Sequence, residues 1–251
     1  MSLADWLDQL WPGLEASAAL LALEPPGWGG NLLRGAANSL IIAAGAFGLG
    51  TLIGIGGALG KLGGGPVARD LLAVYTTVVR AVPELVLILL LYYAGTDLLN
   101  RLLAAFGYRP VEISGLAAGI GVLGVVQGAY ATEVLRGAIQ SVPRGQIEAA
   151  RAYGMTPVQT FFRVTFPAML PLALPGLSNL WLIATKDTAL LAIVGFSELT
   201  LETRQAASST RAYFTFFLAA GALYLVMTLV SGRLFGWIEA RYRRHQVGAR
   251  A

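Results

Sequence analysis

The sequence predicts an all-α membrane protein, and three observations lead to that prediction. The chain has 251 residues, of which 56% are apolar and only 13% are charged. Soluble domains carry about 25% charged residues, and a chain of this length cannot bury so much apolar surface inside one globule. Several stretches also reach about 20 residues of mostly apolar chain, which is the length of a membrane-spanning helix. The same composition excludes disorder, because disordered chains are polar and rich in charge.

The residue types that are missing exclude several classes of enzyme. Cysteine is absent, so disulfides, thiolate chemistry and Cys-ligated metals are excluded. The single histidine, His245, stands in a basic tail and leaves no material for a histidine triad or metal cluster. No glycine-rich loop is followed by Lys and Ser or Thr, since Lys61 precedes Leu62, so the chain has no cradle for ATP. We therefore expect no catalytic residue, no metal and no cofactor in this chain.

Five membrane spans are expected, and they stand at about residues 35–60, 71–95, 113–135, 167–195 and 212–236. Five is an odd number, so the two ends of the chain should lie on opposite sides of the membrane. Eleven Lys and Arg residues, among them Lys61 in the loop after the first span, fall on one side and five on the other, and cytoplasmic loops carry the excess. The N-terminus is therefore predicted outside and the C-terminus in the cytoplasm, with residues 241–251 as a basic tail. This topology explains the net charge of +4 without a nucleic-acid partner.

Residues 1–30 form a separate N-terminal extension. Their apolar run, residues 16–23, is too short to span the membrane. Trp6, Trp11 and Trp28 favour a segment that lies at the membrane–water interface on the outside. A poorly ordered extension is the alternative. In the first span, Ala46, Gly50 and Gly54 stand four residues apart, a spacing that we interpret as close helix packing.

The second span contains Arg80 and Glu84, four residues apart and therefore on one face of a helix, which Pro83 between them is expected to loosen. A lone charge inside a bilayer costs at least about 2.5–3.5 kcal/mol, so both side chains should face protein or water. Either they form a neutralised structural pair or they line a substrate path. Near the inner end of the third span, Glu133 and Arg136 are expected to form a structural pair.

The fourth span contains Lys186 and Asp187, which point about 100° apart on a helix, so that one of them is free to face a pore. Thr188 is expected to bond a freed carbonyl. Asn179 lies two turns earlier and faces either the same cavity or a partner subunit.

The loop between the third and fourth spans, residues 143–166, is predicted to form two short helices joined by a sharp bend on the cytoplasmic side, here called the elbow. A short helix is expected from Gln146 to Tyr153, and Gly154 is suited to end it in the left-handed conformation. Thr156 and Gln159 have the spacing of a capping box for a second helix that runs toward the membrane.

This loop also resembles the "EAA" loop of bacterial ATP-binding-cassette (ABC) importers. The match rests on Glu148, Ala149, Ala150, Gly154 and a final aliphatic-x-Pro, with Phe166 where the family usually has leucine. In that family the loop forms a coupling helix that docks on the ATP-hydrolysing subunit. The resemblance thus implies a coupling role for a set that consists of Arg144, Glu148, Ala149, Ala150 and Gly154.

Three further segments resemble the polar-amino-acid permeases, in particular the Q-type subunit of histidine/lysine/arginine/ornithine and opine importers. They are YTTVVRAVPELV (75–86), GAYATEVLRGAIQSVPRGQIEAA (128–150) and TKDTALLAIVG (185–195). The resemblance implies the type I ABC importer permease fold for residues 31–240 and a bacterial inner-membrane location. It also implies three partners: an ATPase dimer that binds ATP and Mg, a second permease subunit, either self or sister, and a periplasmic binding protein.

We therefore expect the membrane subunit of an ATP-driven importer of polar, in particular basic, amino acids. The acid at Glu84 resembles the branch of the family with cationic substrates. The candidate substrate-path residues are Tyr75, Thr76, Arg80, Glu84, Asn179, Lys186, Asp187 and Thr188. The alternatives are a permease for another polar solute such as glutamine, and an ATP-independent channel or carrier.

Overall fold

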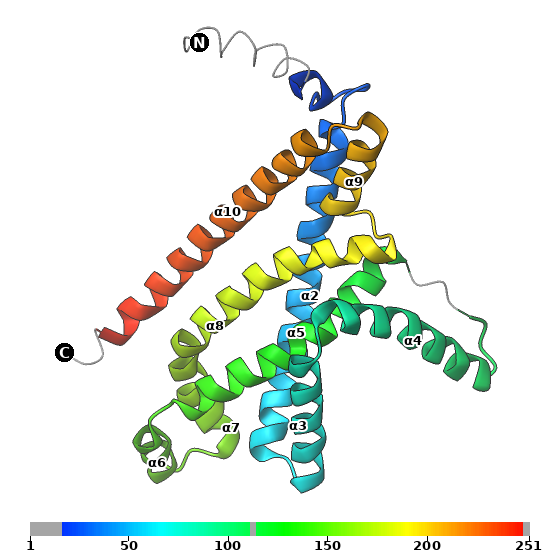
Figure 1. Ribbon diagram of the computed structural model, residues 1–251. Helices are drawn as coiled ribbons and strands as arrows, with labels where there is room; N and C mark the ends of the chain where they lie inside the picture. The colour runs from blue at the N-terminus through cyan, green and yellow to red at the C-terminus, as the bar shows by residue number, and fades with distance from the viewer. Residues whose placement is uncertain (1–16, 111–113, 248–251) are drawn as a thin grey trace.

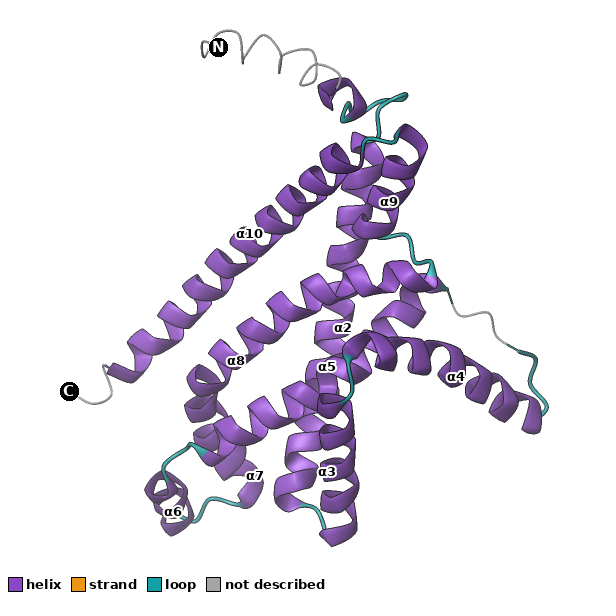
Figure 2. Ribbon diagram, in the orientation of Figure 1, coloured by secondary structure: helices purple, strands orange, loops and turns teal. Residues whose placement is uncertain are grey.

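The computed structural model describes residues 17–110 and 114–247, and every regular element in those ranges is a helix (Figure 2). In chain order the elements are α2 (Gly29–Gly63), α3 (Pro66–Ala81), α4 (Glu84–Ala105), α5 (Gly115–Gln140), α6 (Arg144–Ala152), α7 (Pro157–Thr160), the π-helical η1 (Phe161–Thr165), α8 (Phe166–Asp187), the 3₁₀-helical η2 (Thr188–Val194), α9 (Leu199–Thr210) and α10 (Tyr213–Val247). Residues 1–16, with Trp6 and Trp11, lie outside the described residues, as do 111–113 and 248–251.

Five helical segments of the described chain are long and apolar enough to cross a membrane, as the sequence predicts. They are Gly29–Gly63, Glu84–Ala105, Gly115–Gln140, Pro157–Val194 and Tyr213–Tyr242. All five overlap the predicted spans, the second over residues 84–95 only. The second, predicted at 71–95, is displaced toward the C-terminus.

The displacement arises because the helix breaks at Pro83. Val82 and Pro83 adopt extended conformations, with ψ of 138° and 135°, so α3 ends at Ala81 and α4 begins at Glu84. Proline disfavours the helical conformation of the residue before it and offers no N–H to continue the helix. The expectation of one continuous helix carrying Arg80 and Glu84 on one face is therefore wrong. Instead, α3 runs beside the lower part of α2 and α4 departs in another direction (Figure 1).

Helices α2 and α5 pack closely along the centre of the molecule, through a seam of small residues. Ala46, Gly50 and Gly54 are all buried, which confirms the packing interpretation of their spacing. A Cβ at Gly54 would stand 2.6 Å from the Cβ of Ala131 on α5, which is too close for two carbons that are not bonded to each other. Small residues thus permit the backbone approach on which the centre of the bundle depends.

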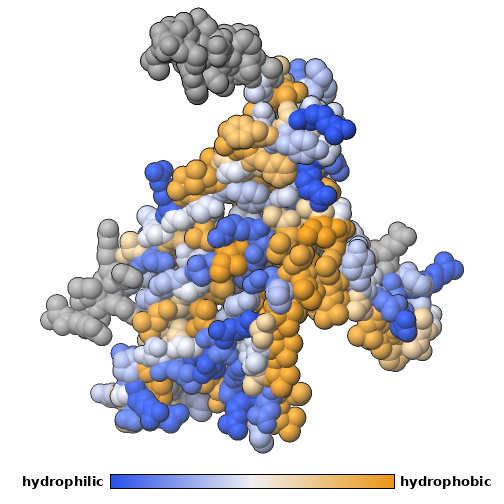
Figure 3. Space-filling view, viewed as in Figure 1, coloured by the Kyte–Doolittle hydropathy of each residue, from blue (hydrophilic) through white to orange (hydrophobic). Residues whose placement is uncertain are grey.

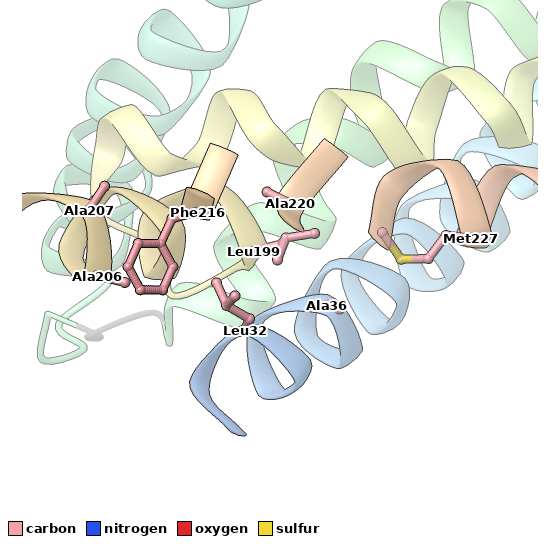
Figure 4. Close-up of a cluster of buried hydrophobic side chains, with 8 residues drawn as sticks. All are labelled: Leu32, Ala36, Leu199, Ala206, Ala207, Phe216, Ala220 and Met227. Carbon is pink, nitrogen blue, oxygen red and sulfur yellow. The ribbon is translucent and has the colours of Figure 1, made fainter. Parts of the chain in front are cut away.

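Helix α9 folds back at the end of the molecule away from α6 and closes a small apolar core with α2 and α10 (Figure 4). Phe216, Leu199 and Leu32 lie at its centre, and Trp28 packs against it from the N-terminal extension. Glu198 begins α9 and is fully buried, and its carboxylate accepts hydrogen bonds from the N–H groups of Thr200 and Leu201. Burial raises the pKa of the Glu198 carboxyl above its ordinary value, although these hydrogen bonds act to lower it.

Helices α4 and α10 leave most of their apolar side chains exposed. Leu90 and Leu98 on α4, and Leu225 and Leu229 on α10, are examples. Apolar residues cover much of the face in Figure 3, whereas hydrophilic ones gather at its lower left, where Figure 1 shows α6 and α7. Apolar surface of this extent requires lipid or partner subunits to cover it.

Candidate functional site

The helix break carries two of the charged residues that the sequence places inside the membrane. Arg80 stands in the last turn of α3, and Glu84 is the first residue of α4. Both engage Tyr130 of α5: the Glu84 Oε1 accepts a hydrogen bond from the Tyr130 hydroxyl at 3.2 Å, and the Arg80 guanidinium lies 5.9 Å from the centre of the Tyr130 ring. No ion pair within 4 Å joins Arg80 to Glu84 in the described chain, so the neutralised pair is not the arrangement observed.

The end of α8 supplies the second carboxylate of this region. Lys186 is exposed whereas Asp187 is half-buried, so the two adjacent side chains do point in different directions. Asp187 Oδ2 accepts a hydrogen bond from Nε2 of Gln127 at 3.3 Å. The Thr188 hydroxyl donates to the carbonyl of Thr185 at 2.8 Å, where α8 tightens into η2, as predicted.

The sequence interpretation missed Gln127 and Tyr130, which bring the two carboxylates together. They stand three residues apart on α5, and Asp187 and Glu84 both lie close enough to Tyr130 for electrostatic interaction. The only signal in the sequence is a polar spacing of one helical turn within an apolar span. Arg80, Glu84, Gln127, Tyr130 and Asp187 are hereafter called the break cluster.

Three other predicted path residues do not join the break cluster by any hydrogen bond of the described chain. The Tyr75 hydroxyl donates to the carbonyl of Val125 at 2.5 Å, which ties α3 to α5. Thr76 is buried and accepts a hydrogen bond from Lys61. Asn179 lies exposed on α8. The first two therefore bond one helix to another, and a role of all three in the substrate path stays a prediction.

A second group of charges lies toward the α6 end of α5. Glu133 accepts hydrogen bonds from Arg136 at 2.7 and 3.0 Å, so this predicted pair is confirmed. Lys61 of α2 was expected only as a loop charge, yet its ammonium lies 2.5 Å from Glu133 and 2.7 Å from the Thr76 hydroxyl. The side chains of Lys61 and Glu133 are only 11% and 19% exposed. These four residues, here called the base network, tie α2, α3 and α5 together.

The loop after α5 has the elbow that the sequence predicts. Helix α6 ends at Ala152, and Gly154 follows with φ of +78°, a conformation that suits glycine. Thr156 and Gln159 form the capping box that begins α7. The chain then passes through η1 directly into α8.

The elbow presents a mixed surface to solvent. Arg144, Glu148, Ala149 and Gly154 are exposed, whereas Ala150 is buried and packs inward. Tyr153 is 88% exposed, with Val158 and Phe162 also exposed beyond the bend. Apolar side chains that protrude so far from a charged loop indicate a surface for contact with another protein.

The fold and these sites define a membrane transport subunit: five candidate spans, charges that converge on one helix, and an exposed helical elbow. The chain belongs to the family of binding-protein-dependent transport system inner membrane components, which matches residues 30–244. It is therefore an inner-membrane permease subunit of the ABC transporter type. Within the described ranges, no three His, Cys, Asp or Glu side chains are grouped so as to hold a metal.

Individual relatives indicate more narrowly which kind of ABC permease this chain resembles. The histidine/lysine/arginine/ornithine transport system permease protein HisQ of Escherichia coli (strain K12) is 41% identical over 86% of this chain and 95% of its own length. The octopine permease protein OccQ of Rhizobium radiobacter is 37% identical over 90% and 95%, and the nopaline permease protein NocQ of Agrobacterium fabrum is 41% identical over 86% and 92%. A crystal structure of an amino acid ABC transporter with histidines aligns with a TM-score of 0.72 at 31% identity, over 85% of this chain and 95% of that chain.

Proposed function

We propose that this chain is the subunit that forms the translocation path in an ATP-driven importer of basic amino acids, such as arginine, lysine, histidine, ornithine or an opine. The observation that carries the proposal is the Glu84 carboxylate, which a tyrosine hydroxyl holds at the break between α3 and α4. A carboxylate of this kind, with Asp187 nearby, favours a guanidinium, ammonium or imidazolium group. The names of the relatives, which include histidine, lysine, arginine and opine permeases, support the same substrate class.

The coupling role belongs to the elbow. We propose that Arg144, Glu148, Ala149 and Gly154 contact an ATPase dimer, which binds ATP and Mg, and that Ala150 contributes by packing α6 in place. The elbow would then lie in the cytoplasm, with the N-terminus outside. A second permease subunit would cover the exposed apolar helices, and an external binding protein would deliver substrate.

Uptake of radiolabelled arginine tests the proposal. The permease, its sister subunit, the ATPase and the binding protein are reconstituted into proteoliposomes, with and without ATP on the ATPase side. The expected result is arginine uptake that requires ATP and that lysine, histidine or ornithine competes.

Two other results would overturn parts of the proposal. ATP-driven uptake of glutamine but not of arginine would support an ATP-driven importer and contradict the assignment of a basic substrate. Uptake that proceeds equally without ATP and without the ATPase would identify a carrier or channel instead.

A further inference from the structure

Two uncharged residues of α5 each hold one carboxylate from a different helix. Gln127 donates to Asp187 of α8, and Tyr130 donates to Glu84 of α4, at 3.3 and 3.2 Å. Because the donors are three residues apart, they share one face of α5. No ion pair within 4 Å reaches either carboxylate in the part of the chain that is described.

Tyr130 also engages the nearest cation. The Arg80 guanidinium stands 5.9 Å from the centre of its ring, within the range of a cation–π contact. Arg80 and Glu84 are separated by only three residues, and a direct pair between a guanidinium and a carboxylate would be strong. One side chain thus holds the acid by its hydroxyl and the base by its ring.

We propose that Tyr130 is a positioning residue for substrate selectivity, because it keeps Glu84 from being neutralised by Arg80. Glu84 then stays available for the cationic end of the substrate. Gln127 likewise holds Asp187 through a hydrogen bond from an uncharged group. Its Oε1 has no hydrogen-bond partner among the described residues although the residue is only 2% exposed, which leaves an acceptor for a further N–H donor. The inference rests on the proposed function, since it assumes a cationic solute.

Arginine and citrulline separate this role from general packing, because citrulline carries an uncharged ureido group of nearly the same shape in place of the guanidinium. We would measure equilibrium binding of each radiolabelled amino acid to the purified complex of permease subunits and ATPase, without binding protein and without ATP. Tyr130→Phe removes the hydroxyl and keeps the ring. The preference for arginine over citrulline should fall about tenfold, the loss expected when a hydrogen bond to a charged group is removed.

Tyr224→Phe is the matched control. The Tyr224 hydroxyl also lies 3.2 Å from a glutamate, Glu198, but in the core around α9. Its loss should leave the arginine preference unchanged even if the melting temperature falls. An equal loss of preference in both variants would overturn the proposal.

A double variant tests the role of the ring. Tyr130→Leu should lower the arginine preference further than Tyr130→Phe, because Arg80 becomes free to pair with Glu84. Adding Arg80→Gln to Tyr130→Leu should restore the preference, whereas a purely structural role of Tyr130 predicts no restoration and would refute the inference.

The two proposals fail in different ways. If the unaltered complex does not prefer arginine to citrulline, the basic substrate of the proposed function is wrong. If it does prefer arginine and the Tyr130 variants match it, only the positioning role is wrong.

Discussion

Glu133 belongs to α5, and Glu84 of α4 contacts Tyr130 one turn away on the same helix, yet the two carboxylates are held in contrasting ways. Glu133 lies between two cations, Lys61 at 2.5 Å and Arg136 at 2.7 Å. Glu84 receives a single hydrogen bond from a neutral tyrosine, while Arg80 is turned to the ring of that tyrosine. The base network is therefore closed by its own charges, whereas the break cluster has carboxylates without a bonded cation in the described chain.

This contrast distinguishes a glutamate with a structural role, Glu133, from a glutamate that is available to bind substrate, Glu84. A charge inside a membrane protein must be compensated, and the base network compensates its own. In the break cluster no ion pair of the described residues compensates Glu84 or Asp187, which is the condition for attracting a solute of opposite charge. Variants of the two glutamates should therefore affect different measurable properties.

The largest effect is expected from Glu133→Gln. The change leaves Lys61 and Arg136 without their anion in a half-buried site, so stability should fall by about 3 kcal/mol. Thermal melting of the purified complex in detergent measures the loss. Asp97→Asn is the control, because its ion pair with Arg101 is exposed and should contribute little. Equal melting temperatures for the two variants would remove the structural role of the base network.

The next effect is expected from Glu84→Gln. Arginine binding should weaken about tenfold, because the ionic partner of the guanidinium is lost. The melting temperature should change little, since the Tyr130 hydroxyl retains an acceptor in the amide. A melting temperature lowered as far as in Glu133→Gln would end the distinction between the two sites.

A smaller effect is expected from Thr156→Ala in the elbow. Loss of the capping box should destabilise the start of α7 by about 1 kcal/mol. ATP-driven uptake should fall while arginine binding stays constant, because the site lies elsewhere. Weaker arginine binding in Thr156→Ala would show that the elbow and the break cluster are not separable.

The smallest effect concerns Glu198, a third carboxylate that only uncharged groups hold, but one that is fully buried. Burial raises its pKa in the folded protein, so folding favours the protonated acid. This contribution is fully present below the ordinary glutamate pKa of about 4.3 and is lost as the pH rises through the raised value. On going from pH 7 to pH 5 the melting temperature should therefore rise more in the unaltered protein than in Glu198→Gln. A difference that does not vary with pH would contradict this expectation.

The sequence predicted what depends on local pattern. Apolar length predicted the five spans, and the elbow followed from Gly154 and the spacing of Thr156 and Gln159. The spacing of Glu133 and Arg136 predicted their pair, because partners three residues apart on one helix need no knowledge of the fold.

What the sequence did not predict depends on contacts between helices. Lys61 read as a loop charge, because only the return of α3 beside α2 brings Thr76 within its reach. Tyr130 and Gln127 looked like parts of an apolar span, since their partners come from α4 and α8. The break at Pro83 was underestimated because proline is tolerated within some membrane helices, and the sequence alone does not distinguish a kink from an end.

The π-helical turn η1, between α7 and α8, sets the angular phase of the elbow. A π-turn holds one residue more than an α-turn, and each residue of an α-helix advances by about 100°. Because the wider turn takes up the extra residue, it keeps the face that α6 presents in phase with α8, whereas the same residues wound as a regular α-helix would rotate α6 by about 100° around the axis of α8. The direction of the elbow therefore depends on whether this one turn is π-helical or α-helical, and a change that tightens the turn would redirect the elbow without changing any residue on its surface.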